Sequence, residues 1–301
     1  MPPTQTELLL LEYLHLKNTH QQKRRTVSKL PHKMRQHELD KIKKSLVPFE
    51  TKFRKELFDT QSSQSEMVIA HYRENIEWAL QYRKWITVYH KGGRQPQDSS
   101  ELPRQIDHSH FRYHELPNVG REGHTYLYYI VSRWNSLPPN VFFTQGSCSI
   151  DHRPFPIESY LMTKPNISLY MNVWNRGIEF DDQPGGILRH IGKWKRERDT
   201  GMMSPSPISF IDWWKEYISP VLPMEGSLEK VFKKWKWSHG AIFSVSRDCI
   251  RQHPLEFYQK LLTNLQRHVN PEEGHFLEKS WFYIFDRDSQ KKMHSKVCPL
   301  K

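Results

Sequence analysis

The chain has 301 residues, enough for one large domain or two modest ones, and its 13% aromatic content argues against a mostly disordered protein. The 45 Lys and Arg residues outnumber the 33 Asp and Glu residues, and the formal net charge of +12 indicates an anionic partner. The 3 cysteines are far apart and form no C-x-x-C pair, which excludes a zinc ribbon and a disulfide scaffold.

Hydropathy gives no sign of a membrane anchor. No run of about 18 apolar residues occurs, so no transmembrane helix is expected. The apolar run Leu8–Leu11 is followed by Glu12 and has no basic residue before it, which makes it a poor signal peptide. The sequence assigns no compartment. We expect a soluble protein, with the cytoplasm slightly favoured.

The first predicted segment is a basic arm with a linker, over residues 1–65. It holds 13 Lys and Arg residues against 7 Asp and Glu residues, a net charge of +6 (13 − 7). Apolar residues between Leu39 and Phe53 recur at steps of three and four, which indicates an amphipathic helix. We expect this arm to contact anionic surfaces, and residues 66–301 to form the folded domain.

After the arm, short apolar runs alternate with helical patterns. In the first half we predict strands at 67–71, 86–89 and 141–144, helices at 76–85 and from 120 to about 134, and a loop at 94–114. Residues 153–237 are expected to form ordered loops with a short helix at 208–218. A strand at 241–245 and helices from 254 to about 268 and at 274–285 follow. This order predicts an α/β fold with a mostly parallel sheet flanked by helices.

Polar residues directly follow the first strand. Ligands of open α/β sheets bind beyond the carboxyl ends of the strands. Tyr72 can stack on a base, Arg73 can pair with a phosphate, and Glu74 can accept hydrogen bonds from a base or ribose. An ordinary helix start explains the same residues equally well, because Glu74 is favourable near the positive end of a helix dipole.

A second polar group precedes the helix that begins near residue 120. Two glycines flank Arg121 and Glu122, and exposed backbone N–H groups together with Arg121 suit an anion. The alternative is that Asn118 caps the helix and Glu122 occupies its first turn. The sequence does not decide between the two.

The end of the strand at 141–144 carries a third group. Gln145 follows the strand, and Asp151 and His152 come soon after it. Asp and His are both ligands for a divalent metal, but two ligands do not complete a site. A surface pair explains them as well.

The start of the last helix carries the fourth group. His275 and Glu278 are three residues apart and therefore share a helix face, where a carboxylate and a histidine can act as a general base or complete a metal site. Capping explains Glu272 and Glu273, because acidic residues are favourable in the first helical turn. It does not require His275 or Glu278.

Together, these segments resemble a known family in an ordered set. The segments are Val68–Asn75, Val88–Gly92, Leu116–Glu122, Phe143–Gly146 with Asp151 and His152, Gly240–Arg247 and Asn270–Glu278. They resemble a family of unknown function, common in fungi, that is distantly similar to GT-A glycosyltransferases. The resemblance covers residues 67–152 and 239–285.

The resemblance implies a GT-A-like, Rossmann-like domain that moves a sugar from a nucleotide-sugar donor to a hydroxyl acceptor. The implied donor-binding residues are Tyr72, Arg73, Glu74, Asn118, Arg121, Glu122 and Gln145. Glu278 or Glu273, with His275, would deprotonate the acceptor. GT-A enzymes hold Mn²⁺ or Mg²⁺ with an Asp-x-Asp motif. This chain has Thr144-Gln145-Gly146 there, so Asp151 and His152 are the nearest candidate ligands for a divalent cation.

Two other classes of function remain open. One is a non-catalytic protein that binds a nucleotide or a carbohydrate on the same fold. The other is a nucleic-acid-binding protein, which the net charge alone suggests. The chain has no helix-turn-helix, RNP or zinc-finger signature to support the second.

Overall fold

The computed structural model describes the chain in several segments. They are residues 65–79, 82, 86–92, 112–148, 157–161, 169–171, 174–175, 184–186, 196, 199–223, 236–237 and 241–286. The chain divides into two units. One comprises Gln64–Pro154 and Thr163–Lys301, and the other comprises Met1–Ser63 and Phe155–Met162, of which helix α4 (Ile157–Leu161) is described. The basic arm predicted over residues 1–65 lies outside the described residues, apart from Ser65.

A six-stranded mixed sheet organises the larger unit, in the order β3-β2-β1-β4-β8-β5. Its strands are β1 (Ser65–His71), β2 (Ile86–His90), β3 (Arg112–Glu115), β4 (Asn140–Gln145), β5 (Leu169–Met171) and β8 (Phe243–Ser246). Strand β1 pairs in parallel with β2 and β4, and β2 pairs in parallel with β3, whereas β8 runs antiparallel to β4 and β5. The mixed, mostly parallel α/β fold is therefore confirmed.

The strands that form the centre of the sheet are buried on both faces. Met67, Val68 and Ile69 of β1 have no exposed surface, which is why this strand is a continuous apolar run and not an alternating one. The predicted adjacency of the strands near 67–71, 86–89 and 141–144 is confirmed, because β1 lies between β2 and β4.

Strands outside this centre differ from the prediction. Residues 94–114 were expected to form a loop, yet residues 112–114 belong to β3. This strand lies at an edge and is polar and largely exposed, so it has no apolar run to reveal it. Strand β5 and the pair β6 (Trp174–Asn175) and β7 (Lys236–Trp237) lie in the region expected to form loops.

The four helices predicted after residue 116 are found with small shifts of their ends. They are α3 (Arg121–Ser132) followed by the 3₁₀ turn η3 (Trp134–Ser136), α7 (Phe210–Trp213) continued by the π-helical turn η4 (Trp214–Ile218), α10 (Leu255–Asn264) continued by η6 (Leu265–Arg267), and α11 (Glu272–Phe285). The short helix α9 (Arg247–Ile250) was not predicted. Of the helix predicted at 76–85, the described residues 77–79 form a 3₁₀ turn.

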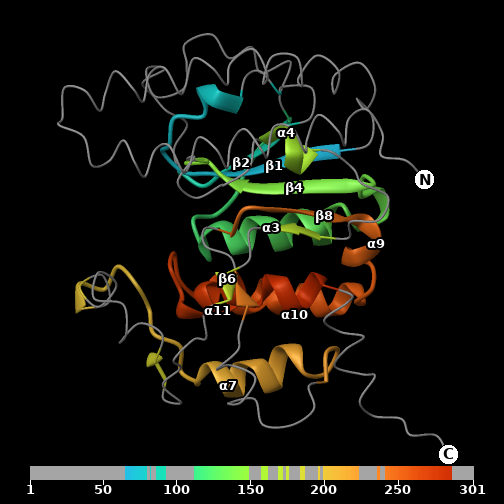
Figure 1. Ribbon diagram of the computed structural model, residues 1–301. Helices are drawn as coiled ribbons and strands as arrows, with labels where there is room; N and C mark the ends of the chain where they lie inside the picture. The colour runs from blue at the N-terminus through green and yellow to red at the C-terminus, as the bar shows by residue number, and fades with distance from the viewer. Residues whose placement is uncertain are drawn as a thin grey trace, which may run out of the picture. The chain divides into compact units, whose positions relative to one another are not determined.

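These helices are stacked on one face of the sheet. Figure 1 shows α3 against the sheet, α10 and α11 as the next layer, and α7 beyond them, and the contacts of α3 with β1, α10 and α11 agree with this order. None of the helices in the described ranges has both the length and the apolar character needed to cross a membrane.

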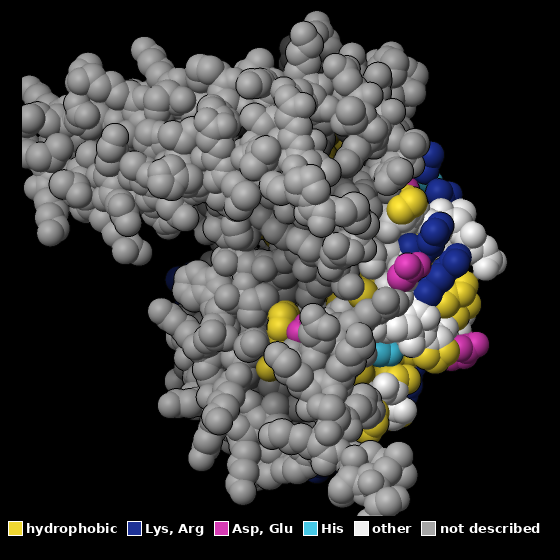
Figure 2. Space-filling view, turned by 45° about the vertical axis from the view of Figure 1, so that its right-hand side comes forward, with side chains coloured by type: hydrophobic (Ala, Val, Ile, Leu, Met, Phe, Trp, Pro, Cys, Tyr) yellow, Lys and Arg dark blue, Asp and Glu magenta, His cyan; other side chains and the backbone are white. Residues whose placement is uncertain are grey.

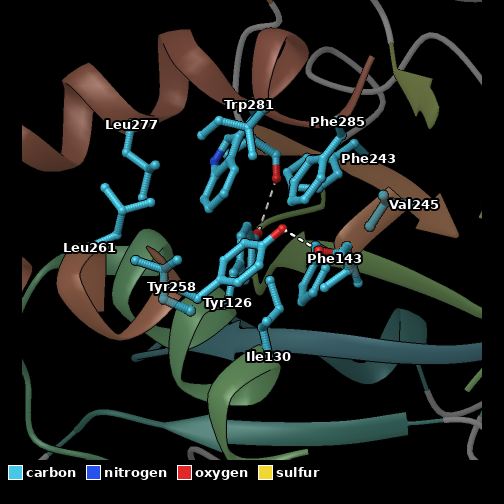
Figure 3. Packing of buried hydrophobic residues seen from close by; sticks show 14 of the residues in the cluster. Tyr126, Ile130, Phe143, Phe243, Val245, Tyr258, Leu261, Leu277, Trp281 and Phe285 are labelled. Carbon is cyan, nitrogen blue, oxygen red and sulfur yellow. Dashed lines mark hydrogen bonds between the residues drawn. The ribbon is translucent and has the colours of Figure 1, made fainter. Parts of the chain in front are cut away.

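Aromatic side chains fill the layer between the sheet and α11. The ring of Tyr126 lies 4.8 Å from that of Phe143 and 5.9 Å from that of Phe243, measured between centroids, and Trp281 stacks on Phe285 at 5.5 Å (Figure 3). Aromatic pairs at these distances stabilise a core beyond the area they bury. Trp213 and Trp214 are also fully buried, which agrees with a role in core packing rather than in stacking on a ligand.

Basic side chains near α9 serve the fold. Figure 2 brings forward the side of the molecule on which α9 lies in Figure 1, and it shows Lys and Arg side chains mixed with acidic and apolar ones. The guanidinium of Arg251 donates to the carbonyl of Trp134 (2.8 Å), and that of Arg247 donates to the carbonyl of Leu137 (3.4 Å). These arginines therefore satisfy backbone carbonyls at the end of the α3–η3 segment.

Candidate functional site

The strand order creates a switch point at the carboxyl end of β1. The chain passes from β1 to β2 and β3 on one side, and it then returns to β4 on the other side of β1. Ligands of open α/β sheets bind at such a point, in the crevice beyond the strand ends. Here the Gly146 N–H donates to the carbonyl of Ala70 (2.8 Å), and the Trp78 indole donates to the carbonyl of Gly146 (2.9 Å). The segments that follow β1 and β4 are thus held together.

Glu74 shapes the loop that follows β1. Its Oε2 atom accepts hydrogen bonds from the backbone N–H groups of Tyr72 (2.8 Å) and Arg73 (3.1 Å). A Cβ atom on Gly146 would lie 2.8 Å from the same oxygen, so a larger residue there would displace this carboxylate. Tyr72 is 38% exposed, and the Arg73 guanidinium carbon lies 4.9 Å from its ring centroid. The loop therefore presents an exposed ring beside a cation.

Two buried histidines support this loop from the ends of β1 and β2. The Nδ1 atoms of His71 and His90 are 3.0 Å apart, and His71 Nε2 lies 2.9 Å from the carbonyl of Glu74. A carbonyl only accepts, so His71 Nε2 carries a proton, and in the neutral pair His90 Nδ1 must donate to His71 Nδ1. The tautomers of both rings thus follow from the position of Glu74.

The start of α3 has an unusual backbone. Gly120, its N-cap residue, has φ 60°, and Arg121 has φ 47°, which is rare for a residue with a side chain. The Gly120 N–H donates to the carbonyl of His268 (2.9 Å), and the Arg121 N–H donates to that of Val269 (3.2 Å). The alternative that Asn118 caps the helix is wrong, because the N-cap residue is Gly120, no side chain caps the helix, and Asn118 is exposed. Two of the N–H groups expected to face an anion bind carbonyls instead.

Lys91 connects the end of β2 to this turn. Its ammonium donates to the carbonyl of Val119 (2.5 Å) and to the carbonyl of Arg121. The residue is 4% exposed, and burial lowers its pKa to about 7, although the negative charge of Glu122 opposes the shift. Lys91 was not predicted, although a lysine directly after a buried strand was a usable signal.

Lys91 should make the stability of the fold depend on pH. Its pKa is about 7 in the folded protein and near the ordinary 10.5 in the unfolded chain. The unfolded state therefore binds more protons between pH 7 and 10.5, so this residue raises the free energy of unfolding as the pH rises through that window, by at most about 1.4 kcal/mol per pH unit. Below pH 7 Lys91 is charged in both states, and the cost of burying its charge lowers the free energy of unfolding by its full amount.

The measurement is urea unfolding at several pH values from about 6 to 10 for the wild type and Lys91→Met. The stability of the wild type should rise relative to that of Lys91→Met across this range. Parallel curves for the two proteins would show that Lys91 keeps an ordinary pKa in the folded state.

His275 and Glu278 lie together on α11. His275 Nδ1 is 3.7 Å from Glu278 Oε2, and its Nε2 lies 3.2 Å from Asn270 Oδ1. Burial lowers the pKa of His275, contact with Glu278 raises it, and the charge of Arg121 lowers it further. Burial alone would raise the pKa of Glu278, but His275, Lys279 and Arg121 together lower it to about 2. Glu278 is thus an ionised carboxylate at neutral pH, with 13% of its side chain exposed.

Glu273 has a structural partner. Both of its oxygens accept from Arg267, at 2.6 Å from Nη2 and at 3.0 and 3.1 Å from Nε, and the Glu273 side chain is 2% exposed. Arg267 also donates to Ser204 and to the carbonyl of Pro205. Between the two catalytic carboxylates expected from the sequence, this geometry favours Glu278 as the one that reaches a ligand.

Electrostatic contacts show which predicted residues come together. Burial is the main cause of the raised pKa of the Tyr126 phenol, and the negative charges of Glu122, Glu278 and Glu74 raise this pKa further. The charge of Arg121 acts on both His275 and Glu278. Glu74, Glu122 and Glu278 thus act on one buried phenol of α3, and Arg121 acts on the His275–Glu278 pair, although these residues are far apart in the sequence.

The remaining predicted residues fall into three groups. Gln145 ends β4 in register with Ala70, at the carboxyl edge of the sheet. Asn118 is exposed in the segment before α3. Asp151 and His152 lie outside the described residues, and within the described ranges no three His, Cys, Asp or Glu side chains are placed to hold a metal ion.

Two further residues at this edge escaped the prediction. Ala241 precedes β8 with φ 47°, and its carbonyl accepts from the Tyr126 hydroxyl (3.1 Å). His124 is 1% exposed in the first turns of α3, and neither ring nitrogen has a hydrogen-bond partner in the described part of the chain. Both depend on tertiary contacts, so no local sequence pattern reveals them.

Comparison with known proteins assigns the chain to a family. No curated protein matches it, and no solved structure matches it either. Because residues 67–301 match the model of the family described as "Protein of unknown function (DUF3431)", the chain belongs to that family.

Proposed function

We propose that the protein is a glycosyltransferase that moves a sugar from a nucleotide-sugar donor to a hydroxyl acceptor. The observations that carry the proposal are the place of Glu74 directly after β1, at the switch point of the sheet, and the charge effects that link it to the other groups. Glu74 and Glu278 both act on the Tyr126 phenol, and Arg121 acts on Glu278. Crevices at such points bind nucleotides in α/β folds. The sequence segments resemble a family distantly similar to GT-A glycosyltransferases, and this resemblance implies the same reaction class.

Each end of the donor has a suitable group in this site. Tyr72 is an exposed ring that can stack on the base, and the neighbouring Arg73 suits a phosphate. Arg121 can stabilise the negative charge that develops on the leaving diphosphate. Arg121 and Ala241 both have positive φ, and strained residues of this kind cluster at functional sites.

The acceptor needs a proton acceptor, and Glu278 is the candidate. The acceptor oxygen would bond to the anomeric carbon while the bond from that carbon to the diphosphate oxygen breaks, and the hydroxyl proton would pass to Glu278. A carboxylate with a pKa near 2 is ionised but weakly basic. Glu278 would therefore take the proton late, when the forming bond has already made the hydroxyl more acidic.

The low pKa of Glu278 also favours a second candidate function. A carboxylate this weak as a base suits hydrogen bonding to sugar hydroxyls as well as it suits proton transfer. The second candidate is therefore a protein that binds a nucleotide or carbohydrate at this site without turnover.

A thermal-shift screen of nucleotide sugars, with and without Mn²⁺, tests binding. A ligand at 100 times its dissociation constant stabilises the fold by about 2.7 kcal/mol, which is a clear rise in melting temperature. We expect one base to stand out across several sugars. If no nucleotide sugar and no free nucleoside diphosphate raises the melting temperature, the proposed donor site is wrong.

A further inference from the structure

The turn that leads into α3 adopts a conformation that its sequence does not favour. Gly120 and Arg121 both have left-handed backbone angles, with φ of 60° and 47°. Glycine reaches this region without strain, but for arginine the Cβ atom comes close to the backbone. A strained residue persists only where the surrounding structure holds it from several directions.

Two sets of hydrogen bonds hold the turn. On one side, the N–H groups of Gly120 and Arg121 bind the carbonyls of His268 and Val269. On the other side, the single ammonium of Lys91 binds the carbonyls of Val119 and Arg121, which flank Gly120. Lys91 is thus the one side chain in the described residues that is seen to bind both carbonyls.

The turn determines the direction in which the Arg121 guanidinium leaves the backbone. That guanidinium is 3.4 Å from Glu122 Oε2, and its positive charge acts on both His275 and Glu278. A rotation of the backbone at Arg121 would carry the guanidinium away from α11. The position of the cation in the candidate site therefore depends on the turn.

We infer that Lys91 is a positioning residue that fixes the left-handed turn at Gly120 and Arg121 and thereby sets where the Arg121 guanidinium lies, beside Glu122 Oε2. Its meaning for catalysis rests on the proposed function, since Arg121 is the group assigned to the leaving diphosphate. The positioning itself does not depend on any ligand.

Other charged and titratable groups near Lys91 do not perform this task. Glu122 interacts with its charge but lies beyond the turn, in the first turn of α3. Burial, and to a smaller extent the positive charge of Lys91, lowers the pKa of His124 to about 3, so its imidazole is neutral near pH 7. The neutral imidazole of His124 leaves Lys91 as the side chain that binds the two carbonyls, as an ammonium below pH 7 and as an amine with two N–H groups above it.

The test is a double-mutant cycle that needs no nucleotide sugar. Lys91→Met, Arg121→Met and the double variant are compared with the wild type, and Lys215→Met is the control for the loss of one exposed lysine charge. The first readout is amide hydrogen exchange at Gly120 and Arg121. The second is the imidazole titration of His275, followed by NMR.

Lys91→Met should speed exchange at Gly120 and Arg121 by at least about tenfold, while exchange at Ile69 in the core stays unchanged. It should raise the pKa of His275 as Arg121→Met does, because both remove the guanidinium charge that lowers it. The double variant should shift His275 no further than Arg121→Met alone. Lys91→Arg, which can also donate to two carbonyls, should restore the wild-type values.

The inference is overturned if Lys91→Met leaves exchange at the turn unchanged, or if Arg121→Met shifts His275 and Lys91→Met does not. Lys91→Gln, which keeps an amide donor, replaces Lys91→Met if that variant does not fold. The outcomes are separable from those of the proposed function. If Lys91 and Arg121 are coupled but no nucleotide sugar binds, this inference stands and the transferase function is rejected. If a nucleotide sugar binds but the two residues are not coupled, this inference is rejected and the transferase function stands.

Discussion

Replacing Glu278 with glutamine is expected to lower the rate of sugar transfer by about 10²-fold or more, the usual loss when a general base is removed. The change removes the negative charge and the proton-accepting oxygen while preserving the shape of the side chain. Because Glu278 is 13% exposed and lies on α11 beside His275, the fold should survive. The measurement is kcat with the nucleotide sugar that the thermal-shift screen identifies.

Glu256→Gln is a matched control for this experiment. Glu256 lies in the first turn of α10, where it is exposed, so the same chemical change there should leave kcat unaltered. A Glu278→Gln variant that transfers sugar at the wild-type rate would remove Glu278 from the mechanism. If the wild type and Glu278→Gln bind the donor equally well and neither transfers sugar, the binding-only function is favoured.

Replacing Arg267 with methionine is expected to lower the free energy of unfolding by about 3 kcal/mol, the scale for removing one partner of a buried ion pair. The guanidinium binds both oxygens of Glu273 and also reaches Ser204 and the carbonyl of Pro205. Without it, the Glu273 carboxylate remains buried and charged with no cation beside it. Urea unfolding at pH 7 measures the loss.

The double variant Arg267→Met/Glu273→Met is the informative comparison. Replacing both charges with apolar groups removes the unpaired buried carboxylate, so the double variant should be more stable than Arg267→Met alone. Arg251→Met, which removes an exposed guanidinium bonded to one carbonyl, should cost about 1 kcal/mol. Equal losses for Arg267→Met and Arg251→Met would contradict the structural role of the Arg267–Glu273 pair.

How far the sequence predicts the fold depends on burial. Strands β1, β2 and β4 are buried on both faces, so each is a short apolar run that stands out. Strand β3 has the residues Arg112-Tyr113-His114-Glu115, whose polar character suits an edge and resembles a loop. Only its pairing with β2 makes it a strand, and pairing is not a local property of the sequence.

The same limit applies to the candidate site. The place of Glu74 directly after a buried strand was predictable, because strand topology brings such positions to the carboxyl edge of the sheet. The partners of the site residues were not predictable. On the sequence, Glu273 differs from Glu278 only in being explained by capping. Its actual partner is Arg267, which comes from the end of the preceding helix.

The place of β1 in the sheet has a consequence for how the chain reaches its native state. One edge of β1 pairs with β2, which follows it closely in the sequence, and the other edge pairs with β4, which is made later. The free edge of β4 pairs with β8, near the end of the described chain. During synthesis the apolar strand Met67–Ala70 therefore has one open edge until β4 (Asn140–Gln145) has been made. Such edges pair readily with other chains, and non-local parallel pairing is slow. We expect fragments that end before β4 to aggregate, and refolding of the whole chain to compete with aggregation as the protein concentration rises.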